Sequence, residues 1–514
     1  MVDPVIVVGG GIAGVSCAST LAQLDPSLVI KLISSTPVLK VATDVKEKGQ
    51  HLESFNVTEQ SVDQLTSQYG NIEIIIGTIS GLDAAEKTLY LESDSTNQQQ
   101  IGQQIKYSKL CICTGARPKL IDNSCPDYII GLRDTSTIKD FEKRLSGSSR
   151  VVVIGNGGIA TELVYSVEFC QIIWAIKDSS FGTTFFDPGA SKFFTQYLRR
   201  EKRPKETIIK RIKYSHSDSN GNPDGGDNSN DDTHGSTSRE YEQKLYGSAL
   251  GPDWGDNVEM KGTHQQMRSV QIEYNCELSR IYYNHQLPPS KYPMIVMEET
   301  TITQSKDLRW PVYVELNNGK IYGCDMIISA TGVIPNVEPF LNGNNLKIGQ
   351  DFGLSVNDQM LTTEIDVYAA GDVCSADWHW SHHWFQMRLW TQARQMGIYS
   401  AHCITSHISQ SDPSLYFPFE LFTHMTSFFG FKVVLLGLFN GHKLDNQYQI
   451  LLRIKEDDEY IKVIMKDGHM QGALLIGETD LEETFENLII NQLDLTDLQD
   501  NLLNSTVDIE DYFD

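Results

Sequence analysis

The sequence predicts an α/β protein made of two three-layer domains with parallel sheets, followed by a smaller α+β domain. Two glycine-rich turns support this prediction, because each follows an apolar strand and opens a helix. They are Gly9-Gly10-Gly11-Ile12-Ala13-Gly14 after Val5–Val8, and Gly155-Asn156-Gly157-Gly158-Ile159-Ala160 after Val151–Ile154. Beyond residue 415 the pattern changes, since short alternating strands replace the order of strand and helix.

Both turns have the spacing of a dinucleotide-binding fingerprint. Their glycines let backbone N–H groups and a helix N-terminus approach a pyrophosphate without a β-carbon in the way. One such turn is weak evidence, but two in the same strand-to-helix context indicate two Rossmann-type domains. We expect one domain to bind a flavin dinucleotide and the other a nicotinamide dinucleotide.

The remaining elements follow in chain order. Residues 1–118 and 323–405 are predicted to form one discontinuous domain, with strands Leu28–Ile33, Asn71–Ile76, Lys109–Cys113, Asp325–Ser329 and Asp366–Ala370 and helices over 13–24 and Phe385–Cys403. Residues 119–322 form the second domain, with a polar insertion at about 215–240 that we expect to be disordered. Residues 415–493 form the third domain, with strands Lys432–Leu436, Tyr460–Met465 and Gly472–Ile476 and helix Leu481–Gln492. Residues 494–514 are predicted to be an acidic tail.

Composition argues against several classes of function. The 42 basic and 67 acidic residues give a net charge of −25, which argues against direct binding to nucleic acid or anionic membranes. No apolar run reaches the roughly 18–20 residues of a membrane helix, and the first strand begins at Val5 without room for a leader. Nine cysteines without C-x-x-C pairs are typical of a reducing compartment and indicate no metal site. We therefore expect a protein of the cytoplasm and nucleus.

The motifs, taken in order, resemble the pyridine nucleotide-disulphide oxidoreductase superfamily. Besides the two fingerprints, they are Thr114-Gly115-Ala116, Ala330-Thr331-Gly332 and Tyr368-Ala369-Ala370-Gly371-Asp372. The stretches 174–178, 247–254, 388–397 and 475–487 are similar to a eukaryotic family of domain-containing proteins within it. This resemblance implies an oxidoreductase that uses FAD and NAD(P)H and protects the tRNA ligase complex from oxidative inactivation. The third domain and the acidic tail would then bind that partner.

The resemblance implies a set of residues that contact FAD. The glycines of the first fingerprint would hold the pyrophosphate, and Ser34 stands where an acidic residue usually binds the ribose. Asp372 would contact the ribityl chain, although a helix-capping role is also open. The expected FAD-binding residues are Gly9, Gly11, Gly14, Ser34, Lys40, Thr114, Gly115, Gly371, Asp372 and Trp390.

Lys40 and Glu162 are the expected catalytic residues. They stand where oxygenase-coupled ferredoxin reductases and similar flavoproteins pair a lysine near flavin N5 with a glutamate. A buried ammonium there would stabilise the anionic reduced flavin, and the carboxylate would compensate its burial. Either residue could instead be an ordinary surface charge, and Trp390, in the W-x-x-A-x-x-x-G helix of those families, could be simple core packing.

The expected residues of the nicotinamide dinucleotide site are Gly155, Gly157, Glu162 and Lys177. Lys177 could bind the 2′-phosphate of NADPH, whereas the neighbouring Asp178 could bind the ribose of NADH. The sequence leaves this choice open.

The dithiol of disulphide reductases is missing. Its place after the first fingerprint falls within Leu39–Glu53, which contains no cysteine. Cys111 and Cys113 are interpreted as core residues, and Cys374 lies nearest to the flavin motif. Two alternatives remain open: a disulphide or quinone reductase with a non-standard cysteine, and a redox-sensing adaptor with little turnover. In the third domain His424-Met425-Thr426 stands where the ferredoxin reductases have an aromatic stretch against the flavin. The far side of the flavin is therefore expected to be either more open or covered by a partner.

Overall fold

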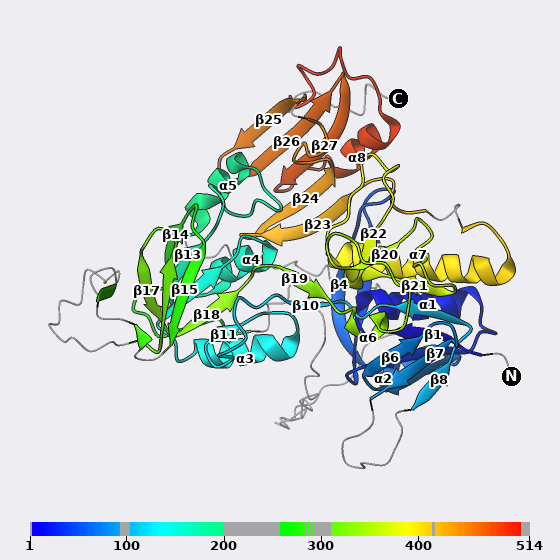
Figure 1. Cartoon of the computed structure of the whole chain (residues 1–514). Helices are drawn as coiled ribbons and strands as arrows, with labels where there is room; N and C mark the ends of the chain where they lie inside the picture. Colours follow the sequence, from blue (N-terminus) through cyan, green and yellow to red (C-terminus); the bar gives the residue numbers. More distant parts are fainter. Residues whose placement is uncertain are drawn as a thin grey trace, which may run out of the picture.

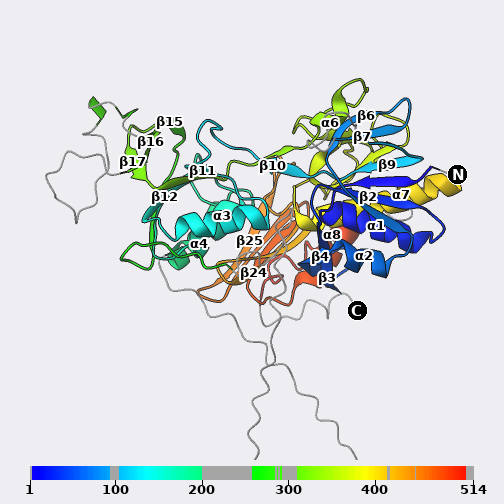
Figure 2. The ribbon, with the colours of Figure 1, turned by 90° about the horizontal axis from the view of Figure 1, so that it is seen from below.

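The computed structural model describes residues 3–92, 103–198, 258–283, 286–287, 290–291, 310–413, 417–445 and 447–504. Two units with parallel sheets lie side by side, and an antiparallel sheet lies across both (Figure 1). The view from below shows the antiparallel sheet between the two units (Figure 2). The predicted fold class is confirmed. Within the described residues, no helix combines the length and apolar composition that crossing a bilayer requires.

The first parallel sheet has β1 at its centre, and all four residues of β1 are buried. Burial on both faces explains the continuous apolar run, since helices cover both sides of a parallel sheet. The order of its strands is β21 (Val367–Ala369), β9 (Lys109–Ile112), β1 (Val5–Val8), β2 (Ile30–Ser34) and β5 (Ile72–Ile76). Residues far apart in the chain thus form one sheet.

Helices α1 (Ile12–Leu24) and α7 (Trp390–Ser409) pack against each other beside this sheet. Their backbones approach so closely that a β-carbon on Gly397 would lie 2.2 Å from the Ala13 carbonyl oxygen. The prediction that α7 begins at Phe385 is wrong. The Gln392 side chain accepts from the backbone N–H of Met387 and donates to the carbonyl of Phe385, which holds these residues extended ahead of the helix.

Several further strands and helices surround the first sheet. The main one is the hairpin of β3 and β4, which occupies the region without cysteine and was not predicted. The elements are β3 (Val38–Glu47), β4 (Glu53–Ser61), α2 (Val62–Gln68), β6 (Ile79–Asp83), β7 (Thr88–Leu91), β8 (Gln104–Lys106), α6 (Glu338–Leu341), β20 (Leu354–Val356) and β22 (Cys374–Ala376).

The second unit contains the second fingerprint. Its parallel sheet has the order β11 (Ile129–Ile130), β18 (Met326–Ser329), β12 (Arg150–Ile154), β13 (Gln171–Ala175) and β14 (Ser269–Glu273). The other elements are α3 (Thr135–Leu145), α4 (Gly158–Ser166), α5 (Pro188–Thr195), β15 (Leu278–Tyr283), β16 (Val312–Leu316) and β17 (Ile321–Cys324). The predicted insertion at 215–240 lies outside the described residues.

One predicted boundary needs correction. The strand Asp325–Ser329 was assigned to the first domain, but β18 pairs with β12 in the second sheet. The chain returns to the first unit only after Ser329, through β19 (Val333–Pro335), which pairs antiparallel with the outgoing connection β10 (Ala116–Pro118). The two connections therefore lie side by side between the units.

The C-terminal sheet has the order β23 (Thr423–Phe428), β24 (Phe431–Gly437), β27 (His469–Ile476), β26 (Glu459–Lys466) and β25 (Gln449–Lys455), with α8 (Glu482–Asn491) against one face. It is joined to both units. Lys462 forms a buried ion pair with Asp187 of the second unit, and Glu486 accepts from the backbone N–H groups of His51 and Leu52 at 2.5 and 3.2 Å.

The predicted tail begins later than expected. Leu495 and Leu502 are buried against the C-terminal sheet, and Arg453 donates to the carbonyl of Leu503 at 3.1 Å. Residues 494–504 are therefore part of the packed domain, because their leucines supply apolar contacts that the acidic composition obscured. Residues 505–514 lie outside the described part of the chain.

Candidate functional site

A cavity of about 1140 Å³ joins the two fingerprints. Residues of both parallel-sheet units and of the C-terminal sheet line it. Of the predicted site residues, those on its wall are Gly9, Gly11, Ser34, Thr114, Gly115, Gly157, Glu162, Asp372 and Trp390. The remaining predicted residues, Gly14, Lys40, Gly155, Lys177 and Gly371, are not among its lining.

The first fingerprint is a turn that only glycine allows. Gly9 has a φ of +128°, and a β-carbon there would lie 2.1 Å from the carbonyl oxygen of Cys113. A β-carbon on Gly14 would lie 1.9 Å from the carbonyl oxygen of Gly9. The turn leads into α1, whose N-cap Gly11 has no side chain to bind the first N–H groups. These groups are thus available for an anion such as a pyrophosphate.

The ribose end of this wall contains Ser34. Its hydroxyl donates to the carbonyl of Thr36 at 2.7 Å, so the hydrogen of this hydroxyl is already used within the protein. The oxygen still has acceptor capacity for a ribose hydroxyl. Thr114 also lines the cavity. Its hydroxyl donates to the carbonyl of Asn336 at 2.8 Å and so links the two interdomain connections.

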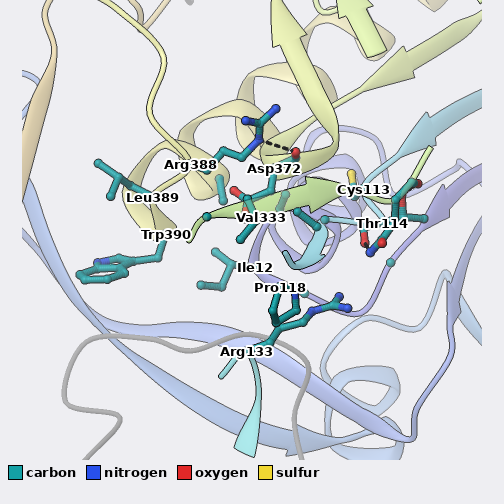
Figure 3. Close-up of a pocket in the computed structure, with 18 of the residues that line it drawn as sticks. Ile12, Cys113, Thr114, Pro118, Arg133, Val333, Asp372, Arg388, Leu389 and Trp390 are labelled. Carbon is teal, nitrogen blue, oxygen red and sulfur yellow. Dashed lines mark hydrogen bonds between the residues drawn. The ribbon is translucent and has the colours of Figure 1, made fainter. Parts of the chain in front are cut away.

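Asp372 lies between two arginines (Figure 3). Arg388 donates from Nε to the Asp372 carbonyl at 2.9 Å and from Nη2 to Asp351 Oδ2 at 2.7 Å. Burial raises the pKa of the Asp372 carboxyl, and the positive charges of Arg388 and Arg133 oppose that rise. Asp372 lines the cavity, where its carboxylate can accept hydrogen bonds from polyol hydroxyls such as a ribityl chain.

Arg133 is a site residue that the sequence analysis missed. It lines the cavity opposite the Arg388–Asp372 pair in Figure 3, and its guanidinium makes no hydrogen bond to another described residue. Burial lowers its pKa, and Asp134 and Asp372 partly offset this effect. A half-buried guanidinium on a cavity wall is suited to bind phosphate oxygens.

We expect Arg133→Ala to weaken FAD binding about 10- to 100-fold, which corresponds to about 1.4–2.8 kcal/mol. The lost interaction is a charge-assisted hydrogen bond to the dinucleotide. Quenching of flavin fluorescence during titration measures the dissociation constant. Arg133→Lys is the matched control and should retain part of the affinity, whereas equal affinity of the parent and Arg133→Ala would contradict this role.

The second fingerprint repeats the first. Gly155 has a φ of +133°, and a β-carbon there would lie 2.0 Å from the carbonyl oxygen of Ala330, whereas Gly157 has no atom within 4 Å of such a position. Gly157 is the N-cap of α4 and lacks a side chain to bind the first N–H groups. Gly155 therefore closes the turn, and Gly157 leaves room for a ligand.

Asp178 is held beside this turn. Its Oδ2 accepts from Asn156 Nδ2 at 2.7 Å and from the hydroxyl of Thr183 at 3.1 Å. Asn156 in turn accepts from the backbone N–H of Gly182 at 2.6 Å, so the carboxylate has a fixed place. Lys177 is exposed beside it.

We expect Asp178→Ala to raise the ratio of kcat/KM for NADPH to that for NADH about tenfold. A fixed carboxylate accepts from the ribose 2′-hydroxyl of NADH and repels the 2′-phosphate of NADPH. Steady-state kinetics with both nucleotides measures this ratio. If Lys177→Ala lowers the ratio and Asp178→Ala leaves it unchanged, the lysine governs the choice.

Lys40 is almost fully buried, and its Nζ lies 2.8 Å from Glu59 Oε1 across the β3–β4 hairpin. Sequence reasoning missed Glu59, because the hairpin itself was not predicted. Glu162 lines the cavity on the other unit. The pairing of Lys40 with Glu162 stays a prediction.

One edge of the C-terminal sheet lines part of the cavity. His424, Thr426 and Phe428 alternate along β23 and line the wall together. The sequence left this side open, but all three side chains are at most 9% exposed. The His424 ring lies edge-on to Trp390, with centroids 5.0 Å apart and an interplanar angle of 62°.

Burial lowers the pKa of His424 to about 3. An unfolded chain therefore protonates this histidine below its ordinary pKa of 6.5, while the folded protein does not, and stability falls as the pH falls through that window. We expect the parent to lose about 2 kcal/mol more than His424→Gln between pH 7 and pH 5. Urea denaturation at both pH values measures the difference, and equal losses would contradict a neutral buried imidazole.

The cysteines form a buried group beneath the first fingerprint. The sulfur atoms of Cys111 and Cys113 lie 3.6 Å apart on one side of their strand, and Cys113 borders the cavity. Cys374 is fully buried, donates to the carbonyl of Gly371 at 3.2 Å, and burial raises its thiol pKa. A raised pKa suppresses the thiolate that disulphide exchange requires.

Fold and site together define a two-dinucleotide oxidoreductase, and comparison with known proteins agrees. Residues 3–202 and 294–397 match the family described as pyridine nucleotide-disulphide oxidoreductase. The chain belongs to this family. It is 45% identical over 515 residues to the human pyridine nucleotide-disulfide oxidoreductase domain-containing protein 1, covering 99% of this chain and 97% of the relative. The protein of that name from Dictyostelium discoideum is 38% identical over 561 residues, covering all of both chains.

Solved structures share the fold. Putidaredoxin reductase, in its covalent complex with putidaredoxin, has a TM-score of 0.61 at 15% identity, covering 96% of this chain and 94% of that chain. The water-forming NADH oxidase from Lactobacillus brevis has a TM-score of 0.61 at 14% identity, covering 96% and 92%. The family and the two fingerprints support FAD and NAD(P)H as the cofactors, as predicted.

Proposed function

We propose that the chain is an FAD-dependent NAD(P)H oxidoreductase in which the flavin accepts hydride and has no dithiol relay behind it. One observation carries this proposal: a single cavity spans both fingerprints and includes Asp372 and the N-terminus of α7. The two cofactors would therefore lie next to each other in this one cavity rather than bind at separate sites. Bound FAD supplies a two-electron acceptor for the hydride of NAD(P)H.

The residues of the chain would prepare this transfer. The N-termini of α1 and α4 and the Arg133 guanidinium bind the two pyrophosphates, and Asp372 orients the ribityl chain. The N-terminus of α7 lines the cavity and has no acidic residue in its first turn, so the positive end of its dipole lies at the cavity wall. The field of this helix end favours negative charge on a flavin ring bound in the cavity.

The β3–β4 hairpin supports the absence of a thiol relay. It fills the region after β2 where disulphide reductases carry their cysteines, and no residue between Leu39 and Glu53 is a cysteine. The reduced flavin would then keep its electrons until an external acceptor takes them. A stable complex of reduced flavin and NAD(P)⁺ fits this arrangement.

The test is an anaerobic titration with NAD(P)H followed by admission of air. We expect the flavin absorbance to bleach, a long-wavelength charge-transfer band to appear, and reoxidation to be slow. Cys374→Ser and Cys111→Ser should leave these spectra and the turnover unchanged. Loss of turnover in either variant would instead support a disulphide or quinone reductase with a non-standard cysteine.

We further propose that the chain protects the tRNA ligase complex from oxidative inactivation, in the cytoplasm and nucleus. The family resemblance supports this partner, and the C-terminal sheet and its acidic extension provide the surface. Because residues 494–504 are packed, the test deletes only residues 505–514. We expect the truncated protein to retain flavin reduction and lose co-purification with the ligase complex, whereas unchanged co-purification would exclude the extension as the contact.

A further inference from the structure

His424 is the residue at which side chains from the three parts of the chain meet. It lies on β23 of the C-terminal sheet and is 1% exposed. Its ring is 5.0 Å from that of Trp390, at the start of α7, and 6.2 Å from that of Phe185, in the second unit. All three residues line the cavity. A polar ring therefore lines the cavity that joins the two fingerprints.

The hydrogen bonding of His424 fixes its tautomer. Its Nδ1 lies 3.1 Å from the hydroxyl of Thr391, which is 2% exposed and lies in the first turn of α7. Among the described residues, the Thr391 hydroxyl has no other acceptor. Because a buried donor without an acceptor is unfavourable, the hydroxyl donates to Nδ1. The proton of the neutral ring is then on Nε2, for which no described residue serves as an acceptor.

The imidazole is neutral for two reasons. Burial lowers its pKa to about 3, and no charged residue offsets the burial. The N-terminus of α7 adds the positive end of a helix dipole next to Thr391, which disfavours a second positive charge. His424 is therefore an uncharged hydrogen-bond donor on the wall of the cavity.

We propose that His424 donates an Nε2–H hydrogen bond to the isoalloxazine ring and thereby favours the reduced flavin over the oxidised flavin, with Thr391 as its positioning residue. This inference rests on the proposed function and adds the residue that sets the reduction potential. Reduction places negative charge on the ring, and a preoriented donor stabilises that charge more than it stabilises the oxidised ring.

The test measures the two-electron midpoint potential of the bound flavin by anaerobic titration against reference dyes. His424→Phe fills the space without a donor, and His424→Gln retains an amide donor. We expect His424→Phe to lower the ratio of affinities for reduced and oxidised FAD about tenfold, which lowers the midpoint potential by about 30 mV. His424→Gln should remain near the parent.

A second pair of variants leaves the ring in place. Thr391→Val removes the hydroxyl that fixes the tautomer and should lower the potential part of the way, whereas Thr391→Ser keeps the hydroxyl and should not. If His424→Phe fails to fold, this pair alone decides the question. Equal potentials in parent and Thr391→Val, or equal losses in His424→Phe and His424→Gln, would overturn the inference. A parent protein that binds FAD but is not reduced by NAD(P)H would instead overturn the proposed function.

Discussion

Gly9→Ala is expected to abolish FAD binding and leave the purified protein colourless. The new β-carbon would lie 2.1 Å from the Cys113 carbonyl oxygen, and the φ of +128° is a conformation that L side chains rarely adopt. The backbones of Gly9 and Cys113 cannot move apart, because the backbone N–H of Cys113 donates to the Val8 carbonyl within the parallel sheet. Overpacking and backbone strain each cost about 1–3 kcal/mol. The turn would open, and the N-terminus of α1 would move away from the pyrophosphate.

The absorbance ratio at 450 and 280 nm of the purified variant measures its flavin content, which we expect to fall close to zero. Gly70→Ala is the control, because Gly70 is exposed and no atom lies within 4 Å of its β-carbon position. That variant should be as yellow as the parent. Full flavin content in Gly9→Ala would show that this turn does not hold the cofactor.

Features encoded by a few neighbouring residues could be predicted from the sequence. β1 has its predicted bounds, because burial on both faces requires a continuous apolar run, and both fingerprints have the expected geometry, because it depends on glycines at fixed spacing. The hairpin of β3 and β4 could not be predicted in this way. Its residues are mostly polar and half-exposed, and neither sheet nor helix periodicity stands out.

The same distinction between local patterns and contacts of distant segments applies to the site residues. Asp372 follows directly from the motif that ends β21, so its place on the cavity wall could be anticipated. Arg133 lies in a loop without a local pattern, and only the folded chain brings it opposite Asp372. Glu59 was missed as the partner of Lys40, since that contact depends on the unpredicted hairpin. Contacts between distant segments carry no signature in either segment alone.

Gly157→Ala is expected to weaken NAD(P)H binding at least tenfold while FAD content and stability remain those of the parent. No atom lies within 4 Å of the β-carbon position, and the φ of −89° suits any L residue, so the protein itself tolerates the methyl group. Tenfold weaker binding corresponds to about 1.4 kcal/mol, a modest result for a methyl group placed against a pyrophosphate. Stopped-flow reduction of the flavin at varied NAD(P)H concentrations measures the dissociation constant.

Gly155→Ala provides the contrast, because its β-carbon would lie 2.0 Å from the Ala330 carbonyl oxygen and should lower the melting temperature as well. The two variants separate the two uses of glycine in one motif. Gly155 shapes the turn, whereas Gly157 only leaves space. A nucleotide affinity that survives in Gly157→Ala would therefore mean that the space is not used, and the second fingerprint would be a structural turn without a ligand. If the affinity falls without a change in stability, the bound nucleotide occupies the space beside Gly157.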